Sequence, residues 1–529
     1  MSVLLASATD QTVGLFINEP SSFDAYTLFT PRSDGDVYLI DTSGRLVHSW
    51  ETDTSSGVTP YLLDDGSIIR MGTLDRAGIE QYDWEGSPTW MFSYNGAEHH
   101  AHHDIEVLPS GNVLMIAYEI KTAEEAIAAG RDPATLTTGE FWPETIIEVE
   151  STGPTTGAIV WDWHVWDHLV QDADPTQDNF GVIADHPELI DISFGSDTFQ
   201  TFEADWLHAN GIDYNQELDQ IILSVRQFGE IWVIDHSTTK EESATHIGGD
   251  RNMGGDILYR WGNPRAYGAG EASAQQLFVP HDAQWIEPGY PGAGNILVFN
   301  NGTGRPGGNY SSIVEFVSTV GETGAYSLTP GLPYGPAAPT WTYSNPSEFY
   351  SPIISGVERL SNGNTFINSG VEGRLFEVTS DGETVWEYIN PIVAEGPLVQ
   401  GSPTLPIGFG SFLFTNSVFQ ARRYGSDYPG LQGRDLTPKG VIELPKPTPM
   451  NTATPTPLPT PTPGFILLGD ANCDGSVNSI DAAVILQFSA GLTDLPACPL
   501  NADLNSSGDI TSVDATIVLQ AVAGLLQLT

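Results

Sequence analysis

Histidine is the residue type in this chain that is best placed to do chemistry. Four of the twelve histidines fall within the segment EHHAHHDIEV, at His99, His100, His102 and His103. Imidazole side chains that lie close together can bind a transition metal, transfer protons or act as nucleophiles. Because the four residues are also neighbours in a polar stretch, the segment alone does not distinguish between these chemistries.

A repeat in the sequence separates these histidines. The segments HDIEV, HANGI and HDAQW begin equivalent strands of consecutive repeats, so His103, His208 and His281 occupy one equivalent position. If the repeats are related by rotation about an axis, we expect these three side chains to point into one central pocket. The other three histidines of the first segment are then expected in the connection before the strand. The alternative is that the repeats share the histidine through duplication, as a turn or cap residue.

An arginine accompanies the three histidines. In ILSVRQFG, Arg226 ends the strand that is expected to pair with the strand of His208. Three imidazoles predict a site for zinc or another transition metal. Together with an arginine they predict instead a site for a tetrahedral oxyanion, in which one histidine is the nucleophile. The arginine favours the second chemistry, because its fork matches sulfate or phosphate oxygens and its charge repels a metal ion. The alternative is that Arg226 only pairs with a carboxylate.

Other charged residues of the same repeats are expected to have structural roles. Asp104 and Asp282 each follow a histidine, so we expect them on the opposite face of the strand, where they orient the backbone or solvent. Arg305, Arg422 and Arg423 are further candidates for anion binding, but we favour surface positions or salt bridges between repeats for them.

The composition limits the partners of the chain. It has 529 residues with 68 acidic and 19 basic side chains, a net charge of −49. This charge repels nucleic acids and anionic membranes and suits a soluble, exported protein. An anionic substrate needs a local pocket of positive groups to overcome it. No apolar run approaches the ~20 residues of a transmembrane helix, and the opening MSVLLASATD is interpreted as the tail of a clipped signal peptide.

Internal repeats predict the fold. One type of segment reads as strand, polar turn and strand ending in tryptophan, as in GDVYLIDTSGRLVHSW and GRLFEVTSDGETVWEY. A second type, again of two strands, follows each copy and has Asp-Gly, Ser-Gly or Asn-Gly pairs at its turns. The unit is therefore about four strands, recurring six times. Such a repeat predicts a mainly β fold, a six-bladed β-propeller, with a sandwich of hairpins as the alternative.

Composition divides the chain into four parts. The Pro/Thr-rich stretch PKPTPMNTATPTPLPTPTPGF predicts an extended linker over residues 445–465. We expect an N-terminal segment over 1–30, the propeller over 31–444 and a small module over 466–529. The two cysteines, Cys473 and Cys498, lie in this module and are able to form a disulfide in an oxidising compartment.

The C-terminal module contains a duplicated calcium-loop pattern. GDANCDGSVNSID and NADLNSSGDITSVD lie 33 residues apart, and each leads into an apolar-patterned helix. Ligand-type residues fall at loop positions 1, 3, 5 and 12 with glycine at position 6, and position 12 is aspartate instead of the usual glutamate. The expected calcium ligands carry hard oxygen atoms and are Asp470, Asn472, Asp474, Asn478 and Asp481 in the first loop, and Asp503, Asn505, Ser507, Asp509 and Asp514 in the second.

The repeats resemble a known family of enzymes. HHDIEVLPSGNVL, LHANGIDYNQELDQIILSVRQ, HDAQWIEPGYPGAGNILVFNNGTG and NSVFQARRYGSDYPGLQGRDLTPKG are similar to segments of the bacterial arylsulfate sulfotransferases, over roughly residues 30–440. The resemblance implies a six-bladed propeller that transfers a sulfuryl group from a phenolic sulfate ester to a phenolic acceptor. It further implies a sulfated histidine intermediate and no nucleotide cofactor as sulfuryl donor.

The same resemblance implies roles for individual residues. The site of the family has the order His, His, Arg, His, which is met here by His103, His208, Arg226 and His281. His281 would then be the nucleophile, and His208 and Arg226 would hold the sulfuryl oxygens. His103 would bind an oxygen or act as acid and base on the phenol. Characterised members carry a disulfide near the site, which this body, lacking cysteine, does not have.

The paired loops behind a Pro/Thr linker resemble a type I dockerin. The resemblance implies calcium-dependent folding and binding to a cohesin domain of a scaffoldin or surface protein, and hence a secreted, extracellular protein. Loop positions 10 and 11 contact the partner in that family, and here they are Ser479, Ile480, Ser512 and Val513. The sequence thus predicts an exported arylsulfate sulfotransferase tethered by a dockerin. The alternative is a non-catalytic binding or structural propeller in a cohesin–dockerin assembly.

Overall fold

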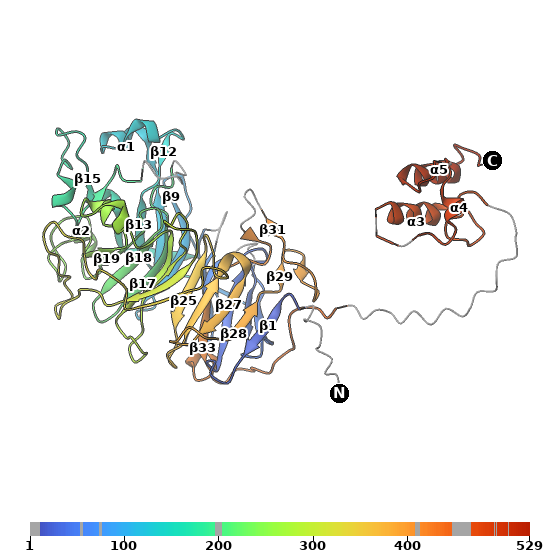
Figure 1. The fold of residues 1–529 in the computed structure, drawn as a ribbon. Helices are drawn as coiled ribbons and strands as arrows, with labels where there is room; N and C mark the ends of the chain where they lie inside the picture. The colour runs from blue at the N-terminus through green and yellow to red at the C-terminus, as the bar shows by residue number, and fades with distance from the viewer. Residues whose placement is uncertain are drawn as a thin grey trace. The chain divides into compact units, whose positions relative to one another are not determined.

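Contacts within the chain divide it into two units, Met1–Lys446 and Pro447–Thr529, which are described separately (Figure 1). The computed structural model describes residues 11–52, 57–72, 77–195, 204–407, 413–446, 467–490, 492–493, 495–505 and 507–528. The opening MSVLLASATD, interpreted as a clipped signal peptide, and nearly all of the expected linker lie outside these residues.

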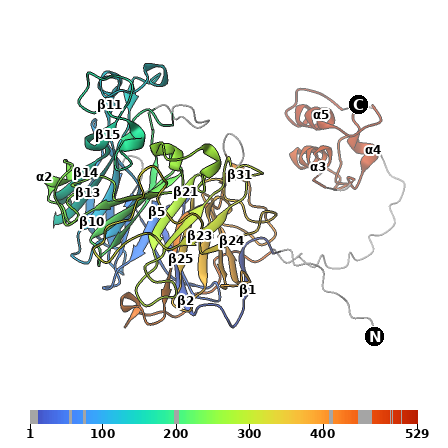
Figure 2. The same ribbon diagram turned by 60° about the vertical axis from the view of Figure 1, so that its left-hand side comes forward.

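The first unit is built from six antiparallel sheets, five with four strands and one with five (Figures 1 and 2). We name these blades A to F and give their strands from the inside outward. Blade A contains β33 (Val418–Gly425), β2 (Ala25–Pro31), β3 (Val37–Ile40) and β4 (Leu46–Trp50), and blade B contains β5 (Gly57–Leu62), β6 (Ile68–Gly72), β7 (Gly78–Tyr82) and β8 (Pro88–Ser93). Blade C contains β9 (His99–Val107), β10 (Val113–Glu119), β13 (Glu144–Gly153) and β14 (Thr156–His164), and blade D contains β17 (Ala209–Asn215), β18 (Gln220–Val225), β19 (Glu230–Asp235) and β20 (Tyr259–Trp261). Blade E contains β21 (Pro280–Trp285), β22 (Ile296–Asn300), β23 (Ser312–Phe316) and β24 (Trp341–Ser344), and blade F contains β25 (Ser355–Arg359), β26 (Thr365–Ser369), β27 (Arg374–Val378), β28 (Thr384–Ile389) and β1 (Gly14–Asn18).

The innermost strands of the six blades form a closed ring. In the order β5, β9, β17, β21, β25 and β33, each strand contacts the next, and β33 contacts β5. A ring of sheets whose inner strands surround one axis is a propeller. The prediction of a mainly β, six-bladed propeller is therefore confirmed.

The local sequence explains the hairpins and the packing between blades. Gly66, Gly111 and Gly363 occupy equivalent turns with φ of 84°, 87° and 91°, a region that favours glycine. The tryptophans of the outer strands lie between blades, where each indole N–H donates to a backbone carbonyl of the next blade. The pairs are Trp50–Asp83, Trp90–Thr156, Trp163–Gly255, Trp261–Pro336, Trp341–Ser380 and Trp386–Thr42.

Both ends of the first unit close the ring, and this corrects one predicted boundary. The expected start of the propeller at residue 31 is wrong, because β1 and β2 precede it. β2 pairs with β33 in blade A, and β1 adds a fifth strand to blade F beside β28. The N-terminal strands are part of the propeller because their hydrogen-bonding partners lie in its last blades.

Two insertions of blade C lie at one end of the propeller. We call the end where each innermost strand begins the upper end and the other the lower end. Since neighbouring strands are antiparallel, the connections β10–β13 and β14–β17 both fall at the upper end. In Figures 1 and 2 the labelled parts of these insertions stand together above the sheets. The insertions contain β11 (Lys121–Thr122), α1 (Ala123–Ala128), η2 (Pro133–Thr135), β12 (Glu140–Phe141), η3 (Val165–His168), β15 (Leu169–Val170), η4 (Ile183–Asp185) and β16 (Ile190–Asp191).

The remaining elements of the first unit are short and lie in connections between strands. They are α2 (Lys240–Ser243), η5 (Pro264–Tyr267), η6 (Ala272–Ala274), η7 (Gly370–Glu372), β29 (Ile392–Val393), β30 (Gly396–Pro397), β31 (Pro406–Ile407), β32 (Leu413–Phe414) and η8 (Pro429–Leu431).

The second unit is helical. It contains α3 (Ser479–Ser489), α4 (Pro499–Ala502) and α5 (Ser512–Val522). Cys473 and Cys498 form a disulfide, as the sequence allows. The small core of the unit is a cluster of buried alanine and branched side chains: Ala471, Ala482, Ile485, Ala502, Ala515 and Val518.

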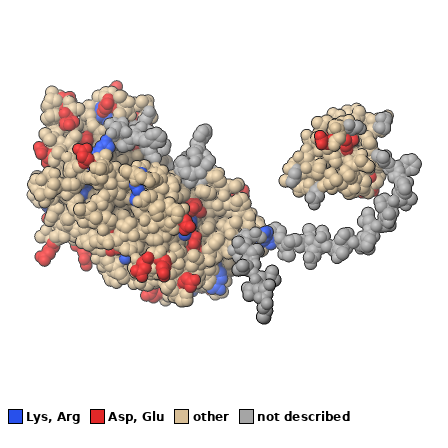
Figure 3. Space-filling view, viewed as in Figure 1, with Lys and Arg blue, Asp and Glu red and all other residues tan. Residues whose placement is uncertain are grey.

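The surface reflects the net charge of −49. On the face shown in Figure 3, acidic groups are spread over the propeller and basic groups are few. Within the described ranges, no helix is both long enough and apolar enough to cross a lipid bilayer.

A buried ion pair between blades A and F predicts a large effect of one substitution on stability. Arg423 of β33 lies 3.0 Å from Glu377 of β27, and both side chains are fully buried. Arg423→Ala should lower the free energy of unfolding by about 3–5 kcal/mol, because it leaves a carboxylate unpaired in the interior. Urea unfolding of the full chain, followed by tryptophan fluorescence, measures this loss.

Arg45→Ala is the matched control. Arg45 pairs with Asp41 at 2.6 Å, but its side chain is 48% exposed. Its removal should cost no more than about 1 kcal/mol. Equal losses for the two variants would show that closure of the ring does not depend on the buried pair.

Candidate active site

The three repeat-equivalent histidines meet at the upper end of the axis. His103 lies in β9, His208 directly precedes β17 and His281 lies in β21. The ring centroids of His103 and His208 are 4.5 Å apart. Phe419 of β33 faces this group, with its ring centroid 5.8 Å from that of His103 and 6.4 Å from that of His281. The convergence expected from the repeat register is observed.

An irregular backbone directs these side chains toward the axis. His103 and His208 have φ of 61° and 53°, in the left-handed region that costs a non-glycine residue about 1–3 kcal/mol. Around His281 the same region is occupied by Val279 and Asp282, at 58° and 48°. The pairing of each of these innermost strands also contains a bulge. Bulges re-aim side chains and cluster near functional sites.

His281 has a defined tautomer. Its Nδ1 lies 2.8 Å from Oδ1 of Asn301, which accepts hydrogen bonds only, so Nδ1 carries the hydrogen. The lone pair of the neutral ring is therefore on Nε2. Burial lowers the pKa of His281 to about 3, with further contributions from Arg226 and His208. His281, which is 2% exposed, is thus an uncharged imidazole with a free Nε2 lone pair.

His208 and Arg226 lie next to each other at the site. The backbone N–H of Arg226 donates to the carbonyl of His208 at 3.3 Å. Arg226 is 7% exposed, and its charge contributes to the lowered pKa of His281. Nδ1 of His208 donates to the carboxylate of Asp205. Burial raises the pKa of Asp205, but the charge and hydrogen bond of His208 outweigh this and hold that pKa below its ordinary value.

A fourth histidine belongs to the site, contrary to the sequence interpretation. His99, His100 and His102 were expected in a connection, but all lie within β9. His102 is buried, and its Nδ1 lies 2.6 Å from Nδ1 of His103. Its Nε2 lies 2.9 Å from Oε2 of Glu144. The bulge at His103 turns the side chains of both His102 and His103 toward the interior. In a regular strand, successive side chains alternate between the two faces, so only one of them would point there.

Contacts from Glu144 to His102 and from His102 to His103 orient the ring of His103. If Nε2 of His102 donates to Glu144, its Nδ1 accepts the hydrogen of His103 Nδ1. Nε2 of His103 is then left with a lone pair. Burial lowers the pKa of His103 well below its ordinary value, helped by His208, His102 and His281. The sequence repeat gives no signal for Glu144, Asp205 or Asn301, because none of them lies at the position that His103, His208 and His281 share.

The axial histidines do not have the geometry of a metal site. In the part of the chain that the structure describes, one group of three or more His, Cys, Asp or Glu residues brings its ligand atoms within 4.8 Å of one another, and no axial histidine belongs to it. The nearby guanidinium of Arg226 also opposes a cation. This arrangement favours an oxyanion over a metal ion as the species held at the axis.

Asp104 and Asp282 orient backbone groups, as expected, but in neighbouring blades. Oδ2 of Asp104 accepts from the N–H of Ile212 at 3.3 Å, and Oδ2 of Asp282 accepts from that of Val357 at 2.6 Å. Both carboxylates are buried. Burial raises the pKa of Asp104 to about 7. These aspartates therefore fasten adjacent innermost strands below the histidines.

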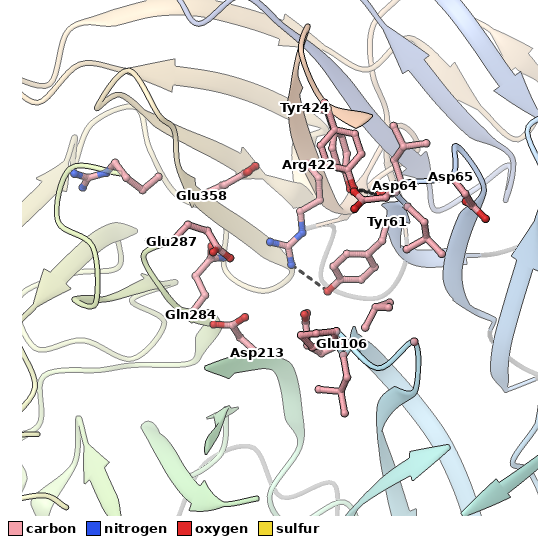
Figure 4. Close-up of a pocket in the computed structure, with 18 of the residues that line it drawn as sticks. Tyr61, Asp64, Asp65, Glu106, Asp213, Gln284, Glu287, Glu358, Arg422 and Tyr424 are labelled. Atoms are coloured by element: carbon pink, nitrogen blue, oxygen red, sulfur yellow. Dashed lines mark hydrogen bonds between the residues drawn. The ribbon is translucent and has the colours of Figure 1, made fainter. Parts of the chain in front are cut away.

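The lower end of the axis holds a cavity that the sequence did not predict (Figure 4). Its volume is about 570 Å³. Arg422 points into it and donates to the hydroxyl of Tyr61 at 3.1 Å. Four carboxylates from different blades surround this arginine: Glu106, Asp213, Glu287 and Glu358. Burial raises the pKa of Asp213 and of Glu358 to about 7.

The other arginines considered as anion binders have structural contacts. Arg423 forms the salt bridge between blades, as expected. Arg305 donates to Oγ of Ser312 at 2.9 Å and lies 4.1 Å from the ring centroid of Tyr310. A cation that the sequence reasoning missed is Arg32, which follows β2 and contributes to the lowered pKa of His103.

The two acidic loops of the second unit are folded in the same way. In the first, Asp470 accepts from the N–H of Asp474 at 3.0 Å, and Asp481 accepts from that of Asn472 at 3.2 Å. In the second, Asp503 and Asp514 accept from the corresponding loop N–H groups. Asp481 and Asp514 are fully buried. The carboxylates at the first and last positions of each loop thus face the same short stretch of backbone. Together they offer a set of oxygen donors that fits a hard cation.

The positions expected to contact a partner lie at the starts of α3 and α5. Ser479 and Ser512 are the first residues of these helices. Ile480 and Val513 follow them and are 58% and 55% exposed. Exposed branched side chains at equivalent places in two repeats form a symmetric apolar feature of the second unit.

Comparisons with known proteins agree with this architecture. The family model of the arylsulfotransferases (ASST) matches residues 16–395, and the model of the dockerin type I domain matches residues 468–523. An arylsulfate sulfotransferase, AssT, of Lelliottia amnigena is 26% identical over 264 residues, 44% of this chain and 40% of that protein. The chain thus spans less than half the length of this relative.

Two solved structures are similar at low sequence identity. A protein of unknown function from Bacteroides caccae is 11% identical with a TM-score of 0.39, covering 76% of this chain and 98% of that one. The β-propeller domain of Cps50 (Swd1) from Myceliophteria thermophila is 12% identical with a TM-score of 0.37, covering 73% and 88%.

The fold and the site together define a six-bladed propeller with a histidine–arginine centre on its axis, followed by a dockerin type I domain. With more than half of its residues matched by the family model, the chain belongs to the arylsulfotransferase (ASST) family.

The carboxylates that line the lower cavity predict how stability depends on pH. Burial raises the pKa of Glu106 well above its ordinary value. The folded state therefore prefers the protonated carboxyl, and its contribution to stability is lost as the pH rises through the pKa of the folded state. Glu106→Gln should be more stable than the unsubstituted chain at pH 8 and nearly equal to it at pH 4, measured by thermal unfolding.

Glu150→Gln is the control for the general effect of removing one negative charge. Glu150 is an exposed residue of β13. Its substitution should change the unfolding temperature little, and to a similar extent at both pH values. A pH-independent effect of Glu106→Gln would contradict the assignment of a protonated carboxyl at the lower end.

Proposed function

We propose that the propeller transfers a sulfuryl group from an aryl sulfate ester to a phenol, with His281 as the nucleophile. The observation that carries this proposal is the free Nε2 of His281, whose Nδ1 is held by Asn301. A neutral imidazole with a directed lone pair, close to a buried guanidinium, is suited to attack an anionic sulfate ester. Membership in the arylsulfotransferase family supports the same chemistry.

In the first half-reaction, Nε2 of His281 attacks sulfur while the bond from sulfur to the aryl oxygen breaks. The electron pair of that bond leaves with the phenolate. Arg226 and His208 bind the sulfuryl oxygens, whose charge changes as the group moves. Because the resting His103 is neutral, with a lone pair on Nε2, the phenolate leaves as the anion and takes its proton from solvent.

In the second half-reaction, the acceptor phenol loses its proton to Nε2 of His103 and attacks sulfur. The bond from sulfur to His281 breaks, and its electron pair returns to Nε2. His102 and Glu144 support His103 as a base, because they hold its Nδ1 hydrogen and leave Nε2 open. Transfer of this proton from His103 to solvent restores the neutral ring before the next cycle.

The surroundings of the site fit an aromatic substrate. The buried ring of Phe419 lies beside both His103 and His281 and offers an apolar wall. Enclosure of His281 keeps bulk water from the sulfated intermediate, which water would hydrolyse. The few cations near the axis supply the local positive field that a strongly acidic protein needs to bind an anion.

His281→Ala should abolish transfer from para-nitrophenyl sulfate to a phenol, with a loss of more than about 1,000-fold. Asn301→Ala should lower kcat by about 10- to 100-fold, because the imidazole is no longer held in the reactive tautomer. The sulfated peptide that contains His281 should be found by mass spectrometry at neutral pH after incubation with donor alone.

His164→Ala is the control, because His164 pairs with Glu119 and Asp162 away from the axis. It should keep full activity. If the unsubstituted chain and His281→Ala behave alike and no sulfated peptide forms, the propeller is a non-catalytic binding or structural module.

We further propose that the second unit binds two calcium ions and a cohesin domain, which would make the protein extracellular. Asp470, Asp481, Asp503 and Asp514 would hold the ions together with the amide, hydroxyl and carboxylate oxygens of the same loops. Calcium would stabilise the loops and set the angle at which α3 and α5 begin. Ser479, Ile480, Ser512 and Val513 would contact the cohesin, and the exposure of the two apolar residues supports this.

Removal of calcium should affect only the second unit. At a free concentration 100-fold above Kd, one bound ion stabilises a folded unit by about 2.7 kcal/mol. Chelation should therefore lower the unfolding temperature of the C-terminal transition, while the propeller transition and the aryl sulfate activity stay unchanged. Differential scanning calorimetry of the full chain separates the two transitions.

Asp481→Asn and Asp514→Asn together should reproduce the chelated state in the presence of calcium. A C-terminal transition that is insensitive to both chelation and these substitutions would contradict calcium binding by the loops.

A further inference from the structure

Three residues outside the axial site form a second cluster of histidine and carboxylate. His168 ends η3, His246 follows α2 and Asp256 precedes β20. One ligand atom from each lies within 4.8 Å of the others. β15, which begins directly after His168, and α2 lie on the same side of the propeller in Figures 1 and 2. The cluster therefore links the second insertion of blade C to the outer part of blade D.

The hydrogen-bond pattern of the cluster requires an additional proton or a cation. Nε2 of His168 lies 2.8 Å from the carbonyl of Ser243, so this nitrogen must carry hydrogen. In the neutral ring, Nδ1 then has a lone pair, yet it lies 2.8 Å from Oδ1 of Asp256. Nδ1 of His246 lies 2.7 Å from the same oxygen. Two acceptors in contact require either an additional hydrogen between them or a cation.

The contacts around His168 match those of a metal-binding histidine. Such histidines donate the second ring N–H to a carbonyl or carboxylate, which fixes the tautomer and the ring orientation. His168 does this toward Ser243 and is fully buried beside Trp163, at 5.8 Å between parallel ring centroids. At Gly255 a Cβ would lie 2.6 Å from Nε2 of His168, so only glycine lets the chain bring Asp256 this close.

The cluster opens into a cavity whose described lining contains no lysine or arginine. The cavity has a volume of about 670 Å³ and is lined by Asp256 and His246, the latter 59% exposed. Its lining also includes the carboxylates of Asp167, Asp178 and Glu188, and no lysine or arginine. A cation entering here meets no repulsion, in contrast to the axial site with Arg226.

We propose that Nδ1 of His168, Nδ1 of His246 and Oδ1 of Asp256 bind a divalent transition metal ion, with zinc as the best match. Two imidazole nitrogens and one carboxylate oxygen are a common ligand set for zinc and disfavour calcium or magnesium, which prefer oxygen alone. The cavity leaves a fourth position for water. The bound ion would fasten the insertion that follows β14 to the loop between α2 and β20.

Cobalt(II) serves as a spectroscopic probe for this site. The full chain is stripped of metals, supplied with saturating calcium to fill the C-terminal loops, and titrated with Co²⁺. One Co²⁺ per chain should bind with visible ligand-field absorption, and Zn²⁺ should displace it. His246→Ala should weaken Co²⁺ binding by about 100-fold or more, since loss of a ligand exceeds the 10- to 100-fold effect of its hydrogen-bond partners.

Two variants show where the ion binds. His281→Ala should retain the Co²⁺ spectrum, which separates the cluster from the axial histidines and makes the result independent of sulfuryl transfer. His164→Ala, which removes another carboxylate-paired histidine of blade C, should also retain it. Thermal unfolding without metal should be unchanged in His246→Ala, because this side chain is mostly exposed.

Absence of Co²⁺ binding to the unsubstituted chain would overturn the proposal and leave a buried, hydrogen-bonded histidine–aspartate pair at His168 and Asp256. Unchanged affinity in His246→Ala, or loss of the spectrum in His281→Ala, would overturn it as well.

Discussion

The hydrogen bonds between β2 and β33 hold the ring of blades closed, and the site at the axis depends on them. The pairing joins Tyr26 to Tyr424 and Leu28 to Arg422. His103, His208 and His281 come from three different blades, and no blade alone places two of them together. Their separation is therefore set by the angle between blades, which has a single value only when the ring is complete. Cross-blade bonds such as that from Ile212 to Asp104 then fix each innermost strand against its neighbour.

The two ends of the axis have opposite electrostatic character. At the upper end, burial favours the neutral rings of His102, His103 and His281, and Arg226 with Arg32 supplies positive charge. At the lower end, Glu106 and Glu358 are among several carboxylates that share one arginine. For the proposed sulfuryl transfer, a neutral nucleophile is compatible with an anionic substrate, because attack brings no second negative charge to the sulfur. In that proposal, burial of His281 takes the place that a neighbouring general base has for a serine or cysteine nucleophile.

The repeat allowed much of this arrangement to be predicted from sequence. Equivalent positions in a rotational repeat converge, so the register alone assigned His103, His208 and His281 to one centre, and the six-bladed fold followed from the recurring strand pattern. The strands that precede residue 31 were missed, because β2 finds its partner in the last blade and carries no local signal of that pairing.

The residues that support the centre could not be read from the repeat. His102 was missed because a bulge breaks the alternation that assigns faces to strand residues. Asn301 and Asp205 lie in connections, where no period exists. The lower cavity collects single residues from several strands, and only the completed ring brings them together.

Ring closure also determines how long β2 stays without its partner strand during synthesis of the chain. About 390 residues separate the end of β2 from the start of β33. At about 5–20 residues per second, the nascent chain carries an unpaired strand edge for roughly 20–80 s before its partner is made. Unpaired edges are the surfaces on which chains aggregate. Chaperone protection during this interval, more than the final stability of the propeller, would then govern how much protein reaches the folded state.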